Sequence, residues 1–177
     1  IGPRADATRR APSTFAALDL GTNNCRLLIG TPAPDGFRVV DSFSRIVRLG
    51  EGLHRTGRLS DDAMDRAIEA LHACADRLSR RPVRRFRAIA TEACRRAENG
   101  AEFLARARSE TGLDIATISS REEAELALES CASLLCHKNG RALLFDIGGG
   151  STEIAWVRLS GGHAEMIGYE SLPVGVV

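Results

Sequence analysis

The sequence lacks several features that would place a protein in a specialised class. Its five cysteines are scattered and include no C-x-x-C pair, which fits a protein of the reducing cytoplasm. No stretch approaches the roughly 18 consecutive apolar residues of a membrane-spanning helix. The net charge is only +1, so overall charge gives no reason to expect nucleic acid as a partner. We therefore expect a cytoplasmic protein that binds neither membrane nor nucleic acid.

The first part of the chain differs in composition from the rest. Residues 1–13 are polar, carry arginines and contain no apolar core of signal-peptide length. We expect this tail to be disordered. The 177 residues, 44% of them hydrophobic, suffice for one good core and are too few for two complete ones.

Alternating periodicities predict an α/β lobe over residues 14–138, with helices packed on a mixed sheet. Apolar runs bounded by turn residues predict strands at residues 15–21, 25–30, 37–47, 85–91 and 113–118. Apolar residues at helical spacing predict helices at residues 61–78, 101–111 and 121–136. Ser60 is the expected N-cap of the first helix, and Gly112 is expected to end the second.

The last part of the chain repeats the first. Sliding the sequence by 127 positions lays LDLGTNNCRLLI over FDIGGGSTEIAW, so that Asp19 and Gly21 fall on Asp146 and Gly148. The strand that follows recurs at the same offset. Two copies of one strand–turn–strand unit predict two similar lobes that face each other across a cleft. Because the second copy stops after its third strand, we expect residues 139–177 to form only the start of the second lobe.

The glycine run of the second copy needs a physical reason, because glycine is the residue that stabilises a strand least. Glycines at a turn let several backbone N–H groups point at one place, which forms a nest for an anion. The hydroxyl groups that follow add further donors. We therefore predict phosphate binding by Gly148, Gly149, Gly150, Ser151 and Thr152.

Carboxylates accompany this nest and call for a cation. Asp146 and Glu153 cannot themselves bind a phosphate, so we expect Mg²⁺ or another divalent cation between them and the ligand. In the first copy Asp19 repeats the metal-side carboxylate, and Arg26 offers a charged fork. The phosphate-side donors of that copy are Gly21, Thr22, Asn23 and Asn24. Two such loops are expected to clasp a polyphosphate between the lobes.

Five motifs, taken in their order, resemble one protein family. DLGTNNCRLLIG, ATEACRRAENG, SREEAELAL, FDIGGGSTE and SLPVGVV are similar to the exopolyphosphatase and guanosine pentaphosphate phosphohydrolase family, from about Phe15 to Val177. The resemblance covers the N-terminal lobe and the start of the second. It implies the ribonuclease H-like lobes of the superfamily that contains actin, heat-shock-70 and the acetate and sugar kinases. The resemblance also implies that Asp19, Gly21, Asp146, Gly148 and Glu153 bind phosphate and metal.

The resemblance also points to a catalytic carboxylate. In the family this residue is a Glu just before a small residue at the start of a helix, which matches Glu123 before Ala124. As general base it would take a proton from the water that attacks the terminal phosphorus. The same letters, SREE, also fit a capping box with Ser120 as N-cap and Glu123 at the third helical position. Arg95 matches an Arg that the family places near the phosphates.

These features predict a hydrolase that removes terminal phosphates from inorganic polyphosphate with Mg²⁺ and a water activated by Glu123. Guanosine pentaphosphate is the alternative substrate. Where many members of the family have Arg, this chain has Glu125, which weighs against long polyphosphate. A different class is an ATP-dependent phosphotransferase or an actin-like nucleotide-binding protein without catalysis. A homodimer is common among such enzymes, and nothing in the sequence specifies one.

Overall fold

The computed structural model describes residues 13–34, 36–135 and 139–176. The predicted tail, residues 1–13, lies outside these ranges apart from Ser13. Within them, no helix is both long and apolar enough to cross a membrane.

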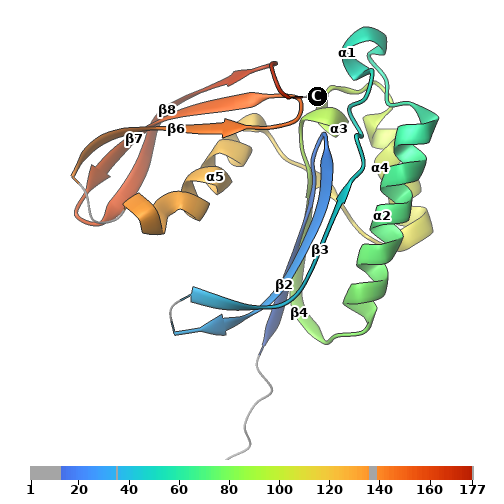
Figure 1. Cartoon of the computed structure of the whole chain (residues 1–177), viewed down its shortest axis with the longest axis horizontal. Coiled ribbons are helices and arrows are strands. Elements are labelled where there is room, and N and C mark those ends of the chain that lie inside the picture. Colours follow the sequence, from blue (N-terminus) through green and yellow to red (C-terminus); the bar gives the residue numbers. More distant parts are fainter. Residues whose placement is uncertain (1–12, 35, 136–138, 177) are drawn as a thin grey trace, which may run out of the picture.

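The first sheet has five strands in the order β3-β2-β1-β4-β5 (Figure 1). Their bounds are β1 (Thr14–Leu20), β2 (Asn24–Ala33), β3 (Gly36–Ile46), β4 (Val83–Ala90) and β5 (Ala116–Thr117). The β1–β2 and β2–β3 pairs are antiparallel, whereas β4 runs parallel to β1 and β5 parallel to β4. This confirms the predicted mixed sheet. The strand expected at residues 113–118 is much shorter, because only two of its residues pair with β4.

The described residues form five helices beside the two sheets: α1 (Leu53–Thr56), α2 (Asp61–Ser79), α3 (Glu92–Arg96), α4 (Gly100–Thr111) and α5 (Ser120–Leu135). Ser60 caps α2, since its Oγ accepts a hydrogen bond from the backbone N–H of Ala63 at 3.3 Å. Gly112 ends α4 in the left-handed conformation, with φ of 73°. Both predicted helix boundaries are confirmed. The single-turn helices α1 and α3 were not predicted, because four or five residues show no periodicity.

The core of the first lobe lies between its sheet and the pair α2 and α4. Every second residue of β1, namely Ala16, Leu18 and Leu20, is buried against this pair. From α2 the core receives Ala67, Ile68, Ala70, Leu71 and Cys74, and from α4 it receives Phe103 and Ala107. Figure 1 shows α2 and α4 on one side of this sheet and α5 on the other.

The second sheet repeats the first three strands closely. It is an antiparallel meander of β6 (Gly140–Ile147), β7 (Thr152–Ser160) and β8 (His163–Leu172). Asp19 pairs with Arg26 in the first sheet, and at the offset of 127 residues Asp146 pairs with Glu153 in the second. Even the register shift recurs at that offset, between residues 29 and 30 in β2 and between residues 156 and 157 in β7. The duplication predicted from sequence is thus present in strand order and register.

Helix α5 packs against the second sheet. Leu128 of α5 is buried in one cluster with Ala155, Val157 and Leu159 of β7. The prediction placed this helix in the first lobe, with the boundary at residue 138. Leu126 of the same helix lines a cavity with Leu27, Phe43 and other residues of the first sheet, so α5 contacts both sheets and the boundary at residue 138 stays a prediction. Alternation of helices and strands cannot show which of two sheets a connecting helix covers.

The other face of the second sheet is exposed. Leu143, Phe145 and Ile147 of β6 have 54%, 57% and 64% of their surface accessible. At the repeat offset these residues correspond to Ala16, Leu18 and Leu20, which α2 and α4 bury in the first lobe. The same pattern of apolar residues is therefore covered in one copy and open in the other, within the part of the chain that the structure describes.

Candidate active site

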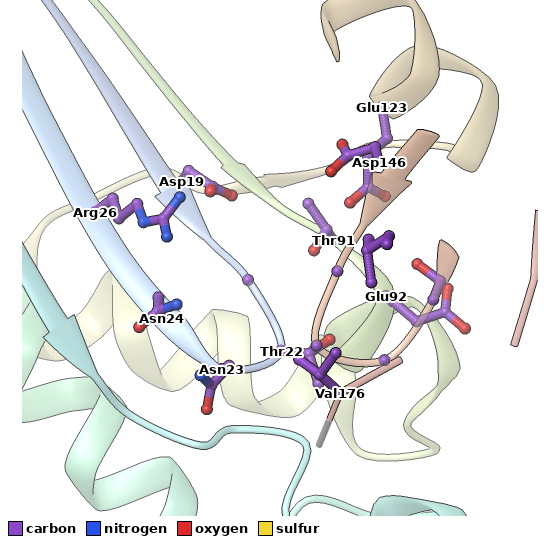
Figure 2. A pocket seen from close by; sticks show the side chains of 16 residues that line it. Asp19, Thr22, Asn23, Asn24, Arg26, Thr91, Glu92, Glu123, Asp146 and Val176 are labelled. Atoms are coloured by element: carbon purple, nitrogen blue, oxygen red, sulfur yellow. The ribbon is translucent and has the colours of Figure 1, made fainter. Parts of the chain in front are cut away.

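The two predicted loops meet at one cleft of about 260 Å³. Each loop is closed by the same backbone hydrogen bond: Gly21 N–H donates to the Asn24 carbonyl, and Gly148 N–H donates to the Ser151 carbonyl, both at 2.9 Å. Figure 2 shows Asp19 and Arg26, from β1 and β2, on one side of the cleft, and Asp146 and Glu123 on the other. The walls therefore come from both halves of the duplication.

Backbone donors line the cleft where the two loops touch. A Cβ atom on Gly149 would stand 3.1 Å from the backbone nitrogen of Asn23, so the loops abut directly. The N–H groups of Thr22, Asn23, Gly149 and Gly150 have no backbone acceptor among the described residues. Such unpaired amides beside glycines are the donors that an anion nest needs.

The first loop is held from behind by the segment that follows β3. Val47 N–H and Arg48 N–H donate to the Asn23 carbonyl at 2.8 and 3.0 Å, and Gly50 N–H donates to the Thr22 carbonyl at 2.9 Å. A Cβ atom on Gly50 would stand 2.3 Å from the Thr22 methyl group. The first loop is thus fixed by backbone contacts, and its amides keep their direction without a ligand.

Two carboxylates face each other across the cleft. Burial raises the pKa of Asp19; Arg26 opposes this shift, and the negative charge of Asp146 adds to it. Within the described ranges, no three His, Cys, Asp or Glu side chains lie close enough together to hold a metal by themselves. Mg²⁺, however, typically uses one or two protein carboxylates and completes its octahedron with waters and substrate phosphates. Asp19 and Asp146 fit that requirement.

Glu153 and Thr152 lie differently from the prediction. Glu153 is 2% exposed, does not line the cleft, and accepts a hydrogen bond from Ser171 Oγ at 2.9 Å. The Thr152 hydroxyl donates to the Val174 carbonyl at 2.6 Å, so it is not directed at a ligand. Both residues begin β7, and their side chains are held by Ser171 of β8 (His163–Leu172) and by Val174 just after it.

Glu123 reaches the cleft from the first turn of α5. The helix is capped by Ser119, whose Oγ accepts from Glu122 N–H at 3.1 Å, so the predicted cap at Ser120 is wrong by one residue. Glu123 therefore lies one position beyond the capping box, and its side chain makes no cap bond. Burial and the nearby charge of Glu153 raise the pKa of Glu123 to about 7, against the lowering effect of Arg95.

Arg95 does not line the cleft, although the resemblance implied a place near the phosphates. Its guanidinium lies behind Glu123 and donates to that carboxylate at 3.2 Å. Sequence reasoning also missed four residues that line the cleft: Thr91, Glu92, Ile147 and Val176. Each lies within a quoted motif, ATEACRRAENG, FDIGGGSTE or SLPVGVV, and those motifs were the only signal available.

The structure thus brings most of the predicted site together. The cleft is lined by Asp19, Gly21, Thr22, Asn23, Asn24, Arg26, Glu123, Asp146, Gly148, Gly149, Gly150 and Ser151. The three predicted residues outside its lining are Arg95, Thr152 and Glu153.

Comparisons with known proteins agree with this architecture. The family model described as "Ppx/GppA phosphatase family" matches residues 29–177. The chain is 34% identical to the PPX-GPPA enzyme of Aquifex aeolicus, with a TM-score of 0.78 over 94% of this chain and 54% of that one. It is 28% identical to an exopolyphosphatase from Cytophaga hutchinsonii, with a TM-score of 0.84 over 92% of this chain and 51% of that one. The predicted fold class is confirmed, and the chain spans about half the length of the solved structures it matches.

Proposed function

The chain belongs to the Ppx/GppA phosphatase family, and we propose that its cleft hydrolyses the terminal phosphoanhydride bonds of inorganic polyphosphate. One observation carries this proposal: the two copies of the D-x-G turn place Asp19 and Asp146 on opposite walls of one cleft that Glu123 also lines. A cleft with carboxylates on both walls and amide donors at its base suits a phosphate chain accompanied by a cation.

The residues divide the chemistry between them. The free amides of Thr22, Asn23, Gly149 and Gly150 and the guanidinium of Arg26 would bind the terminal phosphate oxygens, where negative charge grows during the reaction. Glu123 would accept a proton from water as the water oxygen forms its bond to the terminal phosphorus. The bridging P–O bond breaks, and its electron pair leaves with the shortened chain.

Asp19 and Asp146 are the residues that would hold Mg²⁺. The cation, when bound, neutralises charge on the phosphate oxygens. It would also favour the ionised form of Asp19, whose pKa burial raises. Glu153 does not line the cleft, and its Oε1 accepts a hydrogen bond from Ser171 Oγ.

The proposal is tested by phosphate release from the full-length protein with Mg²⁺ and with polyphosphate, guanosine pentaphosphate or ATP as separate substrates. Glu123→Gln should lower phosphate release at least about a thousandfold, to a small residual rate, while substrate binding changes little, because the amide keeps the size of the side chain and cannot accept the proton. Glu122→Gln, whose side chain lies on the same helix turn and pairs with Arg87 at the surface, is the matched control.

Each outcome has a distinct meaning. Release from polyphosphate that depends on Glu123 supports the proposal. Release from guanosine pentaphosphate alone would keep the chemistry and replace the substrate. Transfer of phosphate from ATP to an acceptor would contradict hydrolysis and indicate a phosphotransferase. Binding of nucleotide without phosphate release would indicate a nucleotide-binding protein.

A further inference from the structure

Arg95 binds the Glu123 carboxylate, and every N–H donor of its guanidinium makes a hydrogen bond within the protein. Nε donates to Glu92 Oε2 at 3.1 Å, and Nη2 donates to that oxygen at 2.6 Å and to Glu123 Oε2 at 3.2 Å. Nη1 donates to the Ile118 carbonyl at 2.8 Å and to Glu123 Oε2 at 3.2 Å. A guanidinium has five N–H donors, so these contacts leave none for a phosphate.

Only one oxygen of Glu123 takes part in this contact. Both Arg95 nitrogens bond Oε2, whereas Oε1 has no hydrogen-bond partner among the described residues. The Glu123 side chain is 19% exposed and lines the cleft. The contact therefore holds one oxygen of the carboxylate in place and leaves the other available to a water molecule.

Glu92 anchors Arg95 from the other side. It is 13% exposed, lines the cleft and is also near Arg96, whose Nε lies 3.7 Å from Glu92 Oε1. Helix α3, which carries Glu92 and Arg95, is tied to the first sheet by the hydrogen bond from Thr91 N–H to the Leu20 carbonyl at 3.2 Å. Because α5 packs on the second sheet, Arg95 connects the two halves of the cleft at Glu123.

We propose that Arg95 is a positioning residue and not a phosphate ligand: anchored by Glu92 and the Ile118 carbonyl, it orients Glu123 so that Oε1 faces the attacking water. The inference rests on the proposed role of Glu123 as general base. It differs from the phosphate contact that the family resemblance implied for Arg95.

The first test separates kcat from KM in the full-length protein with polyphosphate. Arg95→Met should lower kcat at least tenfold and leave KM within about twofold, because substrate contacts remain while the base loses its orientation. Arg95→Lys keeps the charge without the planar fork, so kcat should stay at least fivefold low. Arg108→Met, which removes an exposed arginine that pairs with Asp114 away from the cleft, is the matched control and should keep normal kinetics. A tenfold rise in KM with normal kcat in Arg95→Met, or full activity of Arg95→Lys, would overturn the proposal.

A double mutant tests whether Arg95 acts through Glu123. Arg95→Met should cause no further loss of rate in a Glu123→Gln background, because the group that it positions is already gone. A further tenfold loss would show an independent role and overturn the inference. Normal turnover of Glu123→Gln alone would instead overturn the general-base role, so the two failures are distinguishable.

A third variant tests the same inference if Arg95→Met does not fold. Glu92→Gln removes the anionic anchor of Arg95 and keeps a hydrogen-bond acceptor of the same size. We expect kcat to fall severalfold with KM unchanged. Unaltered kcat in a folded Glu92→Gln protein would contradict the anchoring of Arg95.

Discussion

Gly175 lies against Gly149 with no room for a side chain. A Cβ atom on Gly175 would stand 2.2 Å from the Gly149 carbonyl oxygen and 2.5 Å from the Gly150 nitrogen. The next residue, Val176, donates its N–H to the Gly148 carbonyl at 3.2 Å. The segment after β8 thus covers the second loop as the segment after β3 covers the first, which gives the glycine of SLPVGVV a physical reason.

The close approach predicts the effect of Gly175→Ala. The added methyl group must displace the backbone of the second loop, and overpacking of this kind costs about 1–3 kcal/mol. We expect a lower melting temperature and, because the loop amides move, a rise of about tenfold in KM. Thermal unfolding and phosphate release by the full-length protein measure both effects.

Gly168→Ala is the control, because a Cβ atom there would meet only Trp156 at an ordinary 3.7 Å. If Gly175→Ala behaved like this control, the segment after β8 would not fix the second loop.

The repeat made much of the fold predictable. The offset that aligns Asp19 with Asp146 also aligns the strands, the turn hydrogen bonds and the register shift of the two sheets. Local signals at Ser60 and Gly112 fixed two helix ends, because caps depend on neighbouring backbone groups alone.

The parts that sequence could not provide depend on tertiary packing. A connecting helix has its apolar residues at the same positions whichever sheet it covers. The sequence therefore could not show that Leu128 is buried in the second core. A D-x-G motif likewise does not show where side chains point in the strand that follows, and Glu153 lies behind the cleft. Arg95 pairs with Glu92 at local i,i+3 spacing, but its other partners, Ile118 and Glu123, lie 23 and 28 residues further along the chain, and no local pattern encodes those contacts.

The packing of α5 predicts a difference between two of its leucines. Leu128 is 6% exposed in the second core, whereas Leu134 is 77% exposed. Leu128→Ala should lower the free energy of unfolding by about 2–4 kcal/mol through the lost burial and the cavity left behind. Leu134→Ala, the control on the same helix, should change it by less than about 0.5 kcal/mol.

Denaturant unfolding of the full-length protein compares the two leucine variants. Equal stabilities would mean that α5 is not held by the second sheet. A lower kcat in Leu128→Ala would further show that the packing of α5 on the second sheet controls the position of Glu123.

Removal of one cleft carboxylate predicts a change in metal dependence. Asp146→Asn keeps the shape of the side chain and removes the charge that, with Asp19, would hold Mg²⁺. We expect the Mg²⁺ concentration for half-maximal phosphate release to rise at least tenfold. Asp114→Asn is the control, because Asp114 is exposed and pairs with Arg108 away from the cleft. An unaltered Mg²⁺ titration of Asp146→Asn would remove Asp146 from the ligand set.

The environment of Glu123 predicts a dependence of stability on pH. Burial, Glu153 and Asp146 raise its pKa from 4.5 to about 7, and Arg95 acts in the opposite direction. Between these two values the folded state binds more protons at this group than the unfolded state. The stabilising contribution of protonated Glu123 is therefore complete below pH 4.5 and is lost as the pH rises through about 7. The loss is at most roughly 3 kcal/mol.

Glu123→Gln should remove this loss, because the amide stays neutral at every pH. Melting temperatures of the full-length protein, measured without divalent cations from pH 4.5 to pH 8, should fall less with rising pH in Glu123→Gln than in the unaltered protein. At pH 8 the variant should be the more stable of the two, because only the unaltered protein then carries the buried charge. Glu122→Gln, whose side chain pairs with Arg87 at the surface, should follow the unaltered protein.

Parallel curves for Glu123→Gln and the unaltered protein would mean that Glu123 is ionised in the folded state across this range. It would then be a weaker base than the proposed role requires, since proton transfer is most efficient when the pKa of the base lies near the working pH.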